Sequence, residues 1–137
     1  MSFELQRERL VENELRILGI RDEVVLHAMR TVPREVFVSE EMREFAYRNA
    51  PLPIGSGQTI SQPFIVAHMA AALELSPNER VLEIGTGSGY AAAILSRIAK
   101  EVFTVERHRA LAESATERLK QLGYDNVHVR CGDGTRG

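Results

Sequence analysis

The sequence predicts an α/β fold: helices come first, followed by the first βαβαβ part of a doubly wound, Rossmann-like sheet. Three observations lead to this prediction. The 137 residues suffice for one domain of ordinary globular composition, with 44% apolar and 26% charged residues. Apolar residues at helical spacing fill the first half. Three short apolar runs alternate with helical patterns in the second half. We therefore divide the chain into a helical segment, 1–75, and a βαβαβ segment, 76–137, within one domain.

Three helices are expected before residue 50. The apolar stripe of the first consists of Val11, Leu15 and Leu18. Gly19 can end this helix, and Asp22 can cap the second. The second stops before Pro33, because a residue that precedes proline avoids helical angles. Ser39 can cap a third helix that runs through Tyr47.

A polar loop then interrupts the helices. Residues 51–63, PLPIGSGQTISQP, hold three prolines and two glycines in thirteen positions, which is typical of a loop with special backbone angles. A helix of about three turns follows, since apolar residues return at helical spacing. Its apolar positions are Ile65, Met69, Ala72 and Leu73.

The second half alternates between strands and helices. Apolar runs at 81–84, 102–105 and 127–129 predict buried parallel strands, with His128 on the opposite face from its neighbours. Between these runs, apolar residues recur at helical spacing and predict two helices, and Gly123 can end the second of them. Two right-handed crossovers of this kind produce an open parallel sheet.

Composition argues against several classes of protein. A net charge of -2 disfavours a dedicated nucleic-acid binder, and no apolar run is long enough to cross a membrane. The charged N-terminus does not resemble a signal peptide. No metal site is expected, since the four histidines form no metal-binding pair. The single cysteine, Cys131, is expected to be a small buried residue.

A glycine-rich turn follows the first strand of the predicted sheet. In VLEIGTGSGY, Gly85, Gly87 and Gly89 alternate, so the backbone can turn tightly and approach a ligand. A dinucleotide-binding loop needs a glycine at position 90, where Tyr90 stands. A P-loop needs Gly-Lys-Ser/Thr, which is missing. A tight turn without a ligand is the simpler alternative.

Acidic residues at the ends of the three strands narrow the choice of ligand. Glu83 would repel a phosphate but suits a ligand with a positive group, and Glu106 can accept the hydroxyls of a ribose. Asp133, beside Gly132, can accept an amino group such as that of adenine. The alternatives are a solvated charge for Glu106 and an ordinary Asp-Gly turn for Asp133. Together these groups favour S-adenosylmethionine.

At these residues the sequence resembles the class I methyltransferases, through EIGTGSGY, VER and GDG. PLPIGSGQTISQP, with VPREVFV upstream, closely resembles the protein-L-isoaspartate O-methyltransferases, and this resemblance runs from Asp22 to Gly137. It implies a cytoplasmic repair enzyme that transfers a methyl from S-adenosyl-L-methionine to the α-carboxylate of L-isoaspartyl residues in damaged proteins. The second product is S-adenosyl-L-homocysteine.

The resemblance also implies roles for individual residues. Ser61 matches the active-site serine of the family. The substrate loop would contain Gly57, Gln58, Thr59, Ile60 and Gln62. The cofactor would contact Glu83, Gly85, Thr86, Gly87, Ser88, Gly89, Glu106, Gly132 and Asp133. A carboxylate is already ionised at pH 7, so the site needs alignment of the reactants rather than a general base. Ser61 would orient the substrate carboxylate; its alternative role is to cap the helix that follows.

The family pattern continues beyond GDG with a fourth strand, so we expect an incomplete sheet with an unpaired edge on its first strand. Three hypotheses follow. The chain is the amino-terminal part of an isoaspartyl methyltransferase; or it is a cofactor-binding module or subunit that performs no transfer alone; or it is a class I methyltransferase with another substrate. Oligomeric state and preferred protein substrates do not follow from the sequence.

Overall fold

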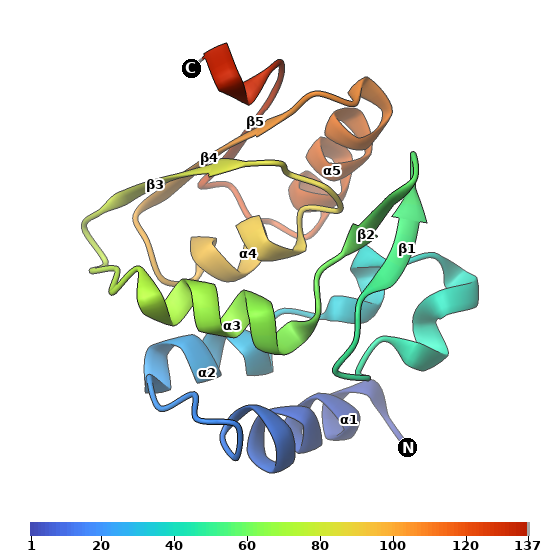
Figure 1. Cartoon of the computed structure of the whole chain (residues 1–137), viewed down its shortest axis with the longest axis vertical. Coiled ribbons are helices and arrows are strands. Elements are labelled where there is room, and N and C mark those ends of the chain that lie inside the picture. The colour runs from blue at the N-terminus through green and yellow to red at the C-terminus, as the bar shows by residue number, and fades with distance from the viewer. Residues whose placement is uncertain (137) are drawn as a thin grey trace.

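A three-stranded parallel sheet forms the top of the molecule in the computed structural model, which describes residues 1–136 (Figure 1). Its strands lie in the order β3–β4–β5, with bounds Arg80–Ile84, Glu101–Glu106 and Val127–Cys131. Helix α4, Tyr90–Ser96, connects β3 to β4, and helix α5, Arg109–Gln121, connects β4 to β5. The predicted βαβαβ arrangement is therefore confirmed.

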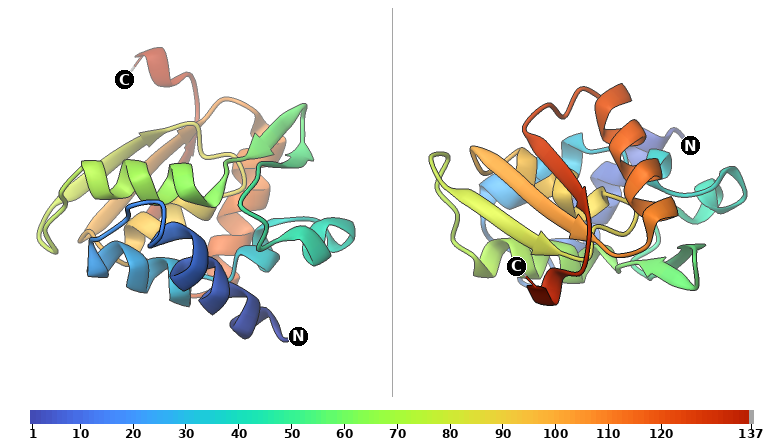
Figure 2. Two further views of the ribbon diagram at one scale, coloured as in Figure 1. Left: turned by 60° about the horizontal axis from the view of Figure 1, so that its bottom comes forward. Right: turned by 90° about the horizontal axis from the view of Figure 1, so that it is seen from above.

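Only one face of this sheet is covered by helices. Val102 and Thr104 are at most 1% exposed on the face toward α4, whereas Leu82 and Phe103 are solvent-accessible on the other. The view from above in Figure 2 shows the three strands in front of α4. His128 lies on the open face, as predicted, and its ring stacks on that of Phe103.

The remaining helices form layers beneath α4 (Figures 1 and 2). Helix α3, Pro63–Ala72, is followed by α2, Glu23–Thr31, and then by α1, Phe3–Leu10, which continues into a π-helical turn, η1, Val11–Leu15. Apolar side chains from all these layers meet α4 in one core. Asp22 caps α2 as predicted, since its Oδ1 accepts a hydrogen bond from the N–H of Val24 at 3.0 Å.

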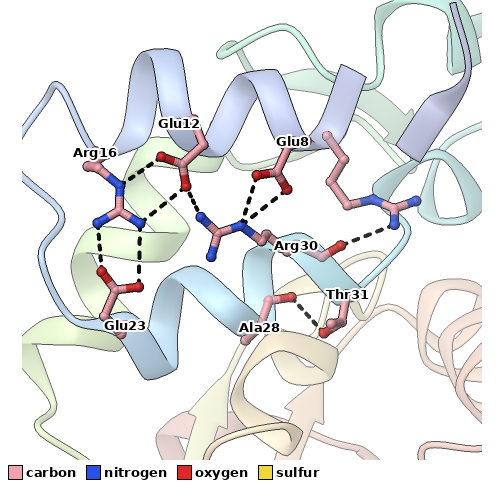
Figure 3. A network of polar contacts seen from close by, with 8 residues as sticks. Glu8, Glu12, Arg16, Glu23, Ala28, Arg30 and Thr31 are labelled. Carbon is pink, nitrogen blue, oxygen red and sulfur yellow. Dashed lines mark hydrogen bonds and ion pairs between the residues drawn. The ribbon is translucent and has the colours of Figure 1, made fainter. Parts of the chain in front are cut away.

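Ion pairs join the first helices at the surface (Figure 3). Arg16 binds Glu12 at 3.0 Å and Glu23 at 2.6 Å. Arg30 binds Glu8 at 3.2 Å and also contacts Glu12. These side chains are partly solvated, so each pair contributes at most about 1 kcal/mol. The network links α1 and η1 to α2 across the surface.

Two predictions for the first half were wrong in detail. The helix expected at 39–47 is a 3₁₀ segment, η3, Glu40–Phe45, and a further 3₁₀ segment, η2, Arg34–Phe37, lies before it. Ser39 directly precedes η3, but its side chain makes no capping bond. Leu18 is 54% exposed rather than buried. The i→i+5 hydrogen bonds of η1 rotate the chain, so the residue three positions after Leu15 leaves the buried stripe.

The segment predicted as a loop contains a β-hairpin. Strand β1, Leu52–Gly55, pairs antiparallel with β2, Gln58–Ile60. Ser56 and Gly57 form the turn, and both have positive φ, 51° and 68°. This is the backbone pattern of a tight two-residue hairpin, which glycine adopts most easily.

Cys131 is exposed, which corrects its prediction as a buried residue. It ends β5, an edge strand whose only sheet neighbour within residues 1–136 is β4. In this part of the chain no helix is both long and apolar enough to span a membrane.

Candidate functional site

A cavity of ≈ 560 Å³ lies between α3, β3 and the start of α4. Three of the predicted site residues line it: Ser61, Glu83 and Gly85. Ser61 belongs to the predicted substrate loop and the other two to the predicted cofactor site. The fold therefore brings these three residues to one cavity, whereas the other twelve predicted site residues do not line it. Most of the remaining wall is apolar, and it includes Ile65 and Met69 of the stripe predicted for α3.

The glycine loop has the geometry expected of a ligand-binding turn. Gly85, Gly87 and Gly89 all have positive φ, at 95°, 55° and 92°. A Cβ on Gly89 would lie 3.2 Å from Leu119 of α5, so this glycine also permits close packing of the loop. The alternation predicted to matter in the sequence thus corresponds to a strained backbone that other residues rarely adopt.

Glu106 holds the glycine loop through its side chain. Its carboxylate is buried at the end of β4, with the residue 5% exposed. Oε1 accepts the backbone N–H of Gly87 and Oε2 that of His108, both at 2.9 Å. This excludes the alternative of a freely solvated charge. Each carboxylate oxygen keeps a second lone pair beyond these two bonds.

Glu83 belongs to a buried polar chain beneath the loop. Thr104 donates a hydrogen bond to Glu83 Oε1 at 2.7 Å, and the Thr104 and Thr86 hydroxyls are 2.6 Å apart. Burial above all, with a smaller contribution from the charge of Glu106, raises the pKa of Glu83 to about 7, against the lowering effect of the Thr104 hydrogen bond. A positive ligand group in the cavity would favour the ionised form of this carboxyl.

Ser88 is buried beside the same loop. Its hydroxyl accepts the N–H of Tyr90 at 3.2 Å, and its carbonyl accepts a hydrogen bond from Arg118 at 2.8 Å. Burial lowers the pKa of Arg118, a cost that this contact offsets in part. Arg118 of α5 thus supports the loop from behind.

The predicted Gly132–Asp133 loop folds onto the end of β4. The Gly132 N–H donates to the Glu106 carbonyl at 2.9 Å. Asp133 is exposed, and its Oδ1 accepts both the N–H and the hydroxyl of Thr135, at 2.9 and 2.7 Å. These bonds lower the pKa of Asp133. The side chain therefore makes the turn named as its alternative, and its second oxygen, Oδ2, lies 4.0 Å from Nε of Arg136.

Ser61 is exposed toward the cavity, and the capping alternative does not apply to it. The cap residue of α3 is Gln62, whose side chain makes no capping bond. The N–H of Phe64 is instead satisfied by Oδ1 of Asn49, at 2.9 Å. Gly57, Gln58 and Thr59 are exposed at the hairpin tip, whereas the Ile60 side chain is buried in the core at 3% exposure.

Comparison with known proteins identifies the family. Residues 5–137 match the family model for "Protein-L-isoaspartate(D-aspartate) O-methyltransferase (PCMT)". The chain belongs to this family. It is 60% identical over 136 residues to the Protein-L-isoaspartate O-methyltransferase 1 of Rhodopseudomonas palustris, covering 99% of this chain and 56% of that protein. It is 61% identical over 134 residues to the Protein-L-isoaspartate O-methyltransferase 2 of Pelobacter propionicus, covering 98% and 60%.

Solved structures of this family share the fold. One protein-L-isoaspartate O-methyltransferase superposes with a TM-score of 0.84 at 34% identity, over 93% of this chain and 42% of that one. A putative member from Plasmodium falciparum, solved in complex with S-adenosyl-L-homocysteine, gives a TM-score of 0.74 at 26% identity, over 92% and 62%. The chain thus spans roughly 60% of the length of the curated relatives named above.

Thr104, Arg118 and Asn49 contribute to the site but were absent from the sequence-based prediction. Thr104 could have been found, because it is a polar residue on the same strand face as buried Val102. Asn49 carried no signal, since it caps a helix that begins fourteen residues further on.

Proposed function

We propose that this family member binds S-adenosyl-L-methionine and takes part in methylating the α-carboxylate of L-isoaspartyl residues in damaged proteins. The observation that carries the proposal is the single cavity lined by Ser61, Glu83 and Gly85. Relatives with 60–61% identity named for this activity support it. From the same resemblance we propose that the protein acts in the cytoplasm.

The residues present fit the cofactor. Glu106 has open lone pairs for ribose hydroxyls, and Glu83 offers a carboxylate to a positive group. The glycine loop leaves backbone exposed to the cavity at Gly85. Thr86 and Ser88 are buried and hold the loop, so we assign them to its support. Gly132 and Asp133, which follow β5, would close the far side of the cofactor site.

The chain's own contribution to transfer is alignment. When bound, S-adenosyl-L-methionine supplies the methyl group: the substrate carboxylate oxygen bonds to the methyl carbon as the carbon–sulfur bond breaks, giving a methyl ester and S-adenosyl-L-homocysteine. Ser61 would donate a hydrogen bond to the substrate carboxylate and orient it. The exposed backbone of Gly57 to Thr59 would receive the substrate chain. Orientation of this kind accelerates reactions without any proton transfer.

A matched pair of peptides tests the proposal. The peptides differ only in an aspartyl or isoaspartyl linkage, and incorporation of base-labile methyl groups from S-adenosyl-L-methionine is measured. Methylation of the isoaspartyl peptide alone supports the proposal, whereas equal methylation of both favours another substrate. Calorimetric titration with S-adenosyl-L-methionine is the companion measurement, because binding without transfer identifies a cofactor-binding module.

Ser61→Ala separates the two halves of the site. We expect transfer to slow by about tenfold or more, as loss of an orienting contact commonly does, with cofactor affinity unchanged. A variant with the wild-type transfer rate would remove Ser61 from the proposed mechanism.

A further inference from the structure

Arg34 is completely buried, yet the cofactor and substrate roles proposed above make no use of it. It begins η2 and is 0% exposed. Within residues 1–136 no carboxylate forms an ion pair with it. A charge buried without a carboxylate is costly unless other acceptors satisfy it. The identity of those acceptors therefore indicates what this arginine does.

The acceptors are four backbone carbonyls. Nη1 donates to the carbonyl of Ala46 at 2.6 Å and to that of Arg48 at 3.3 Å. Nη2 donates to the carbonyl of Ala50 at 2.9 Å and to that of Ser61 at 3.1 Å. One guanidinium thus connects segments that lie 12 to 27 residues away from it in the chain.

Two of these carbonyls flank the hairpin. Ala50 lies two residues before β1, and Ser61 directly follows β2. Their shared donor, Nη2, closes the base of the hairpin that carries the predicted substrate loop. Asn49 makes a second connection at this base through its bond to Phe64, so α3 is tied to the same point.

The surroundings of Arg34 keep its guanidinium in one orientation. Its Cζ atom lies 5.8 Å from the centre of the ring of Tyr90, which is the first residue of α4. A planar guanidinium offers donors in fixed directions, whereas a lysine ammonium is a compact charge with no such fork. Lysine at position 34 would keep the charge but could not serve the same four carbonyls with this geometry.

We infer that Arg34 is a positioning residue, which holds the Ser61 backbone and the base of the hairpin so that Ser61 faces the cavity. The inference rests on the function proposed above. Arg34 does not line the cavity and acts only through Ser61 and the hairpin. Small displacements of an orienting group are known to cost large factors in rate.

Arg34→Lys in the full chain tests this inference, with Arg43→Lys as the matched control, because Arg43 is an exposed arginine of the neighbouring η3. Three quantities are measured below the melting temperature of each variant. These are the amide hydrogen exchange of residues 50–62, the affinity for S-adenosyl-L-homocysteine, and kcat and KM for the isoaspartyl peptide. If Arg34→Lys does not fold, Arg34→Gln, which keeps two N–H donors, takes its place.

We expect faster exchange in residues 50–62, a fall in kcat/KM of about tenfold or more, and cofactor affinity within about twofold of wild type. Arg43→Lys should match wild type in all three. If residues 50–62 of the Arg34 variant exchange their amide hydrogens at the wild-type rate, the inference is overturned, whether or not the wild-type chain transfers methyl groups. Cofactor affinity that falls in parallel with kcat/KM also overturns it, because that pattern belongs to general loosening of the fold. A wild-type chain that methylates no peptide defeats the proposed function separately.

Discussion

The carboxylate of Glu106 accepts a hydrogen bond from the backbone N–H of Gly87 at 2.9 Å, so the end of β4 holds the glycine loop that follows β3. Sequence alone suggests a ribose acceptor or a solvated charge at this position. The structure adds a second role, since the same carboxylate also binds the N–H of His108. Glu106 organises the loop before any ligand arrives.

Glu106→Gln should therefore weaken cofactor binding more than the loss of one ligand contact would. The amide has a single acceptor oxygen, so one of the two backbone N–H groups loses its partner. A charged hydrogen bond is worth about 1.5–3 kcal/mol, which corresponds to a 10- to 100-fold loss of affinity for S-adenosyl-L-homocysteine by calorimetry. Glu101→Gln, at the other end of β4, is the control. Equal effects of the two substitutions would contradict the assignment.

Stability should depend on pH through Glu83. Its pKa is about 7 in the folded chain, against an ordinary value of 4.5. The folded state therefore holds a proton that the unfolded state loses, and stability falls as pH rises from about 4.5 to 7. The full shift corresponds to about 3 kcal/mol. Glu83→Gln should remove this loss, as measured by urea unfolding at pH 5 and pH 8 on both proteins. An equal change in unfolding free energy between pH 5 and pH 8 for wild type and Glu83→Gln would contradict the prediction.

Cofactor affinity should change in the opposite direction over the same range. A positive group bound beside Glu83 favours its ionised form, so affinity for S-adenosyl-L-methionine should rise with pH up to about 7. Below that value the dissociation constant should increase by up to about tenfold per pH unit, since one proton is displaced on binding. Glu83→Gln should bind weakly with a flat pH profile. A flat profile for wild type would show that the cofactor does not contact this carboxyl.

The sheet could be predicted from the sequence because its signals are local. Each strand is a short apolar run, and the glycines at 85, 87 and 89 do adopt the special angles expected of them. The hairpin was missed because its strands are only four and three residues long, too short for alternation to show between prolines and glycines. Leu18 was misplaced because a π turn is not visible in helical spacing.

The contacts that support the site could not be predicted from the sequence. They join residues that lie far apart in the chain, and one partner in each is a backbone group, which leaves no side-chain signal. Arg34 binds carbonyls, which every residue possesses, at positions 46 to 61. Ser61 before a proline resembled a helix cap, but Asn49 performs that function from an earlier segment. In both cases tertiary packing, not local pattern, selects the partner.

Asn49→Ala and Ser61→Ala should consequently differ in stability. Removing Asn49 leaves the Phe64 N–H without its acceptor and should cost about 1 kcal/mol of unfolding free energy, as loss of a helix cap usually does. Ser61 is exposed, and its substitution should change stability by less than about 0.5 kcal/mol. Thermal or urea unfolding of both variants checks this. A destabilised Ser61→Ala with a normal Asn49→Ala would restore the capping role to Ser61.

Gly134→Ala should displace the loop after β5, because an added Cβ would overlap Cγ2 of Ile84. We expect Gly134→Ala to weaken S-adenosyl-L-homocysteine binding by about tenfold or more, as overpacking typically costs 1–3 kcal/mol. Adding Ile84→Ala removes the overlapping methyl group and should restore most of that affinity. If the double variant binds no better than Gly134→Ala, overlap with Ile84 is not the cause of the weaker binding.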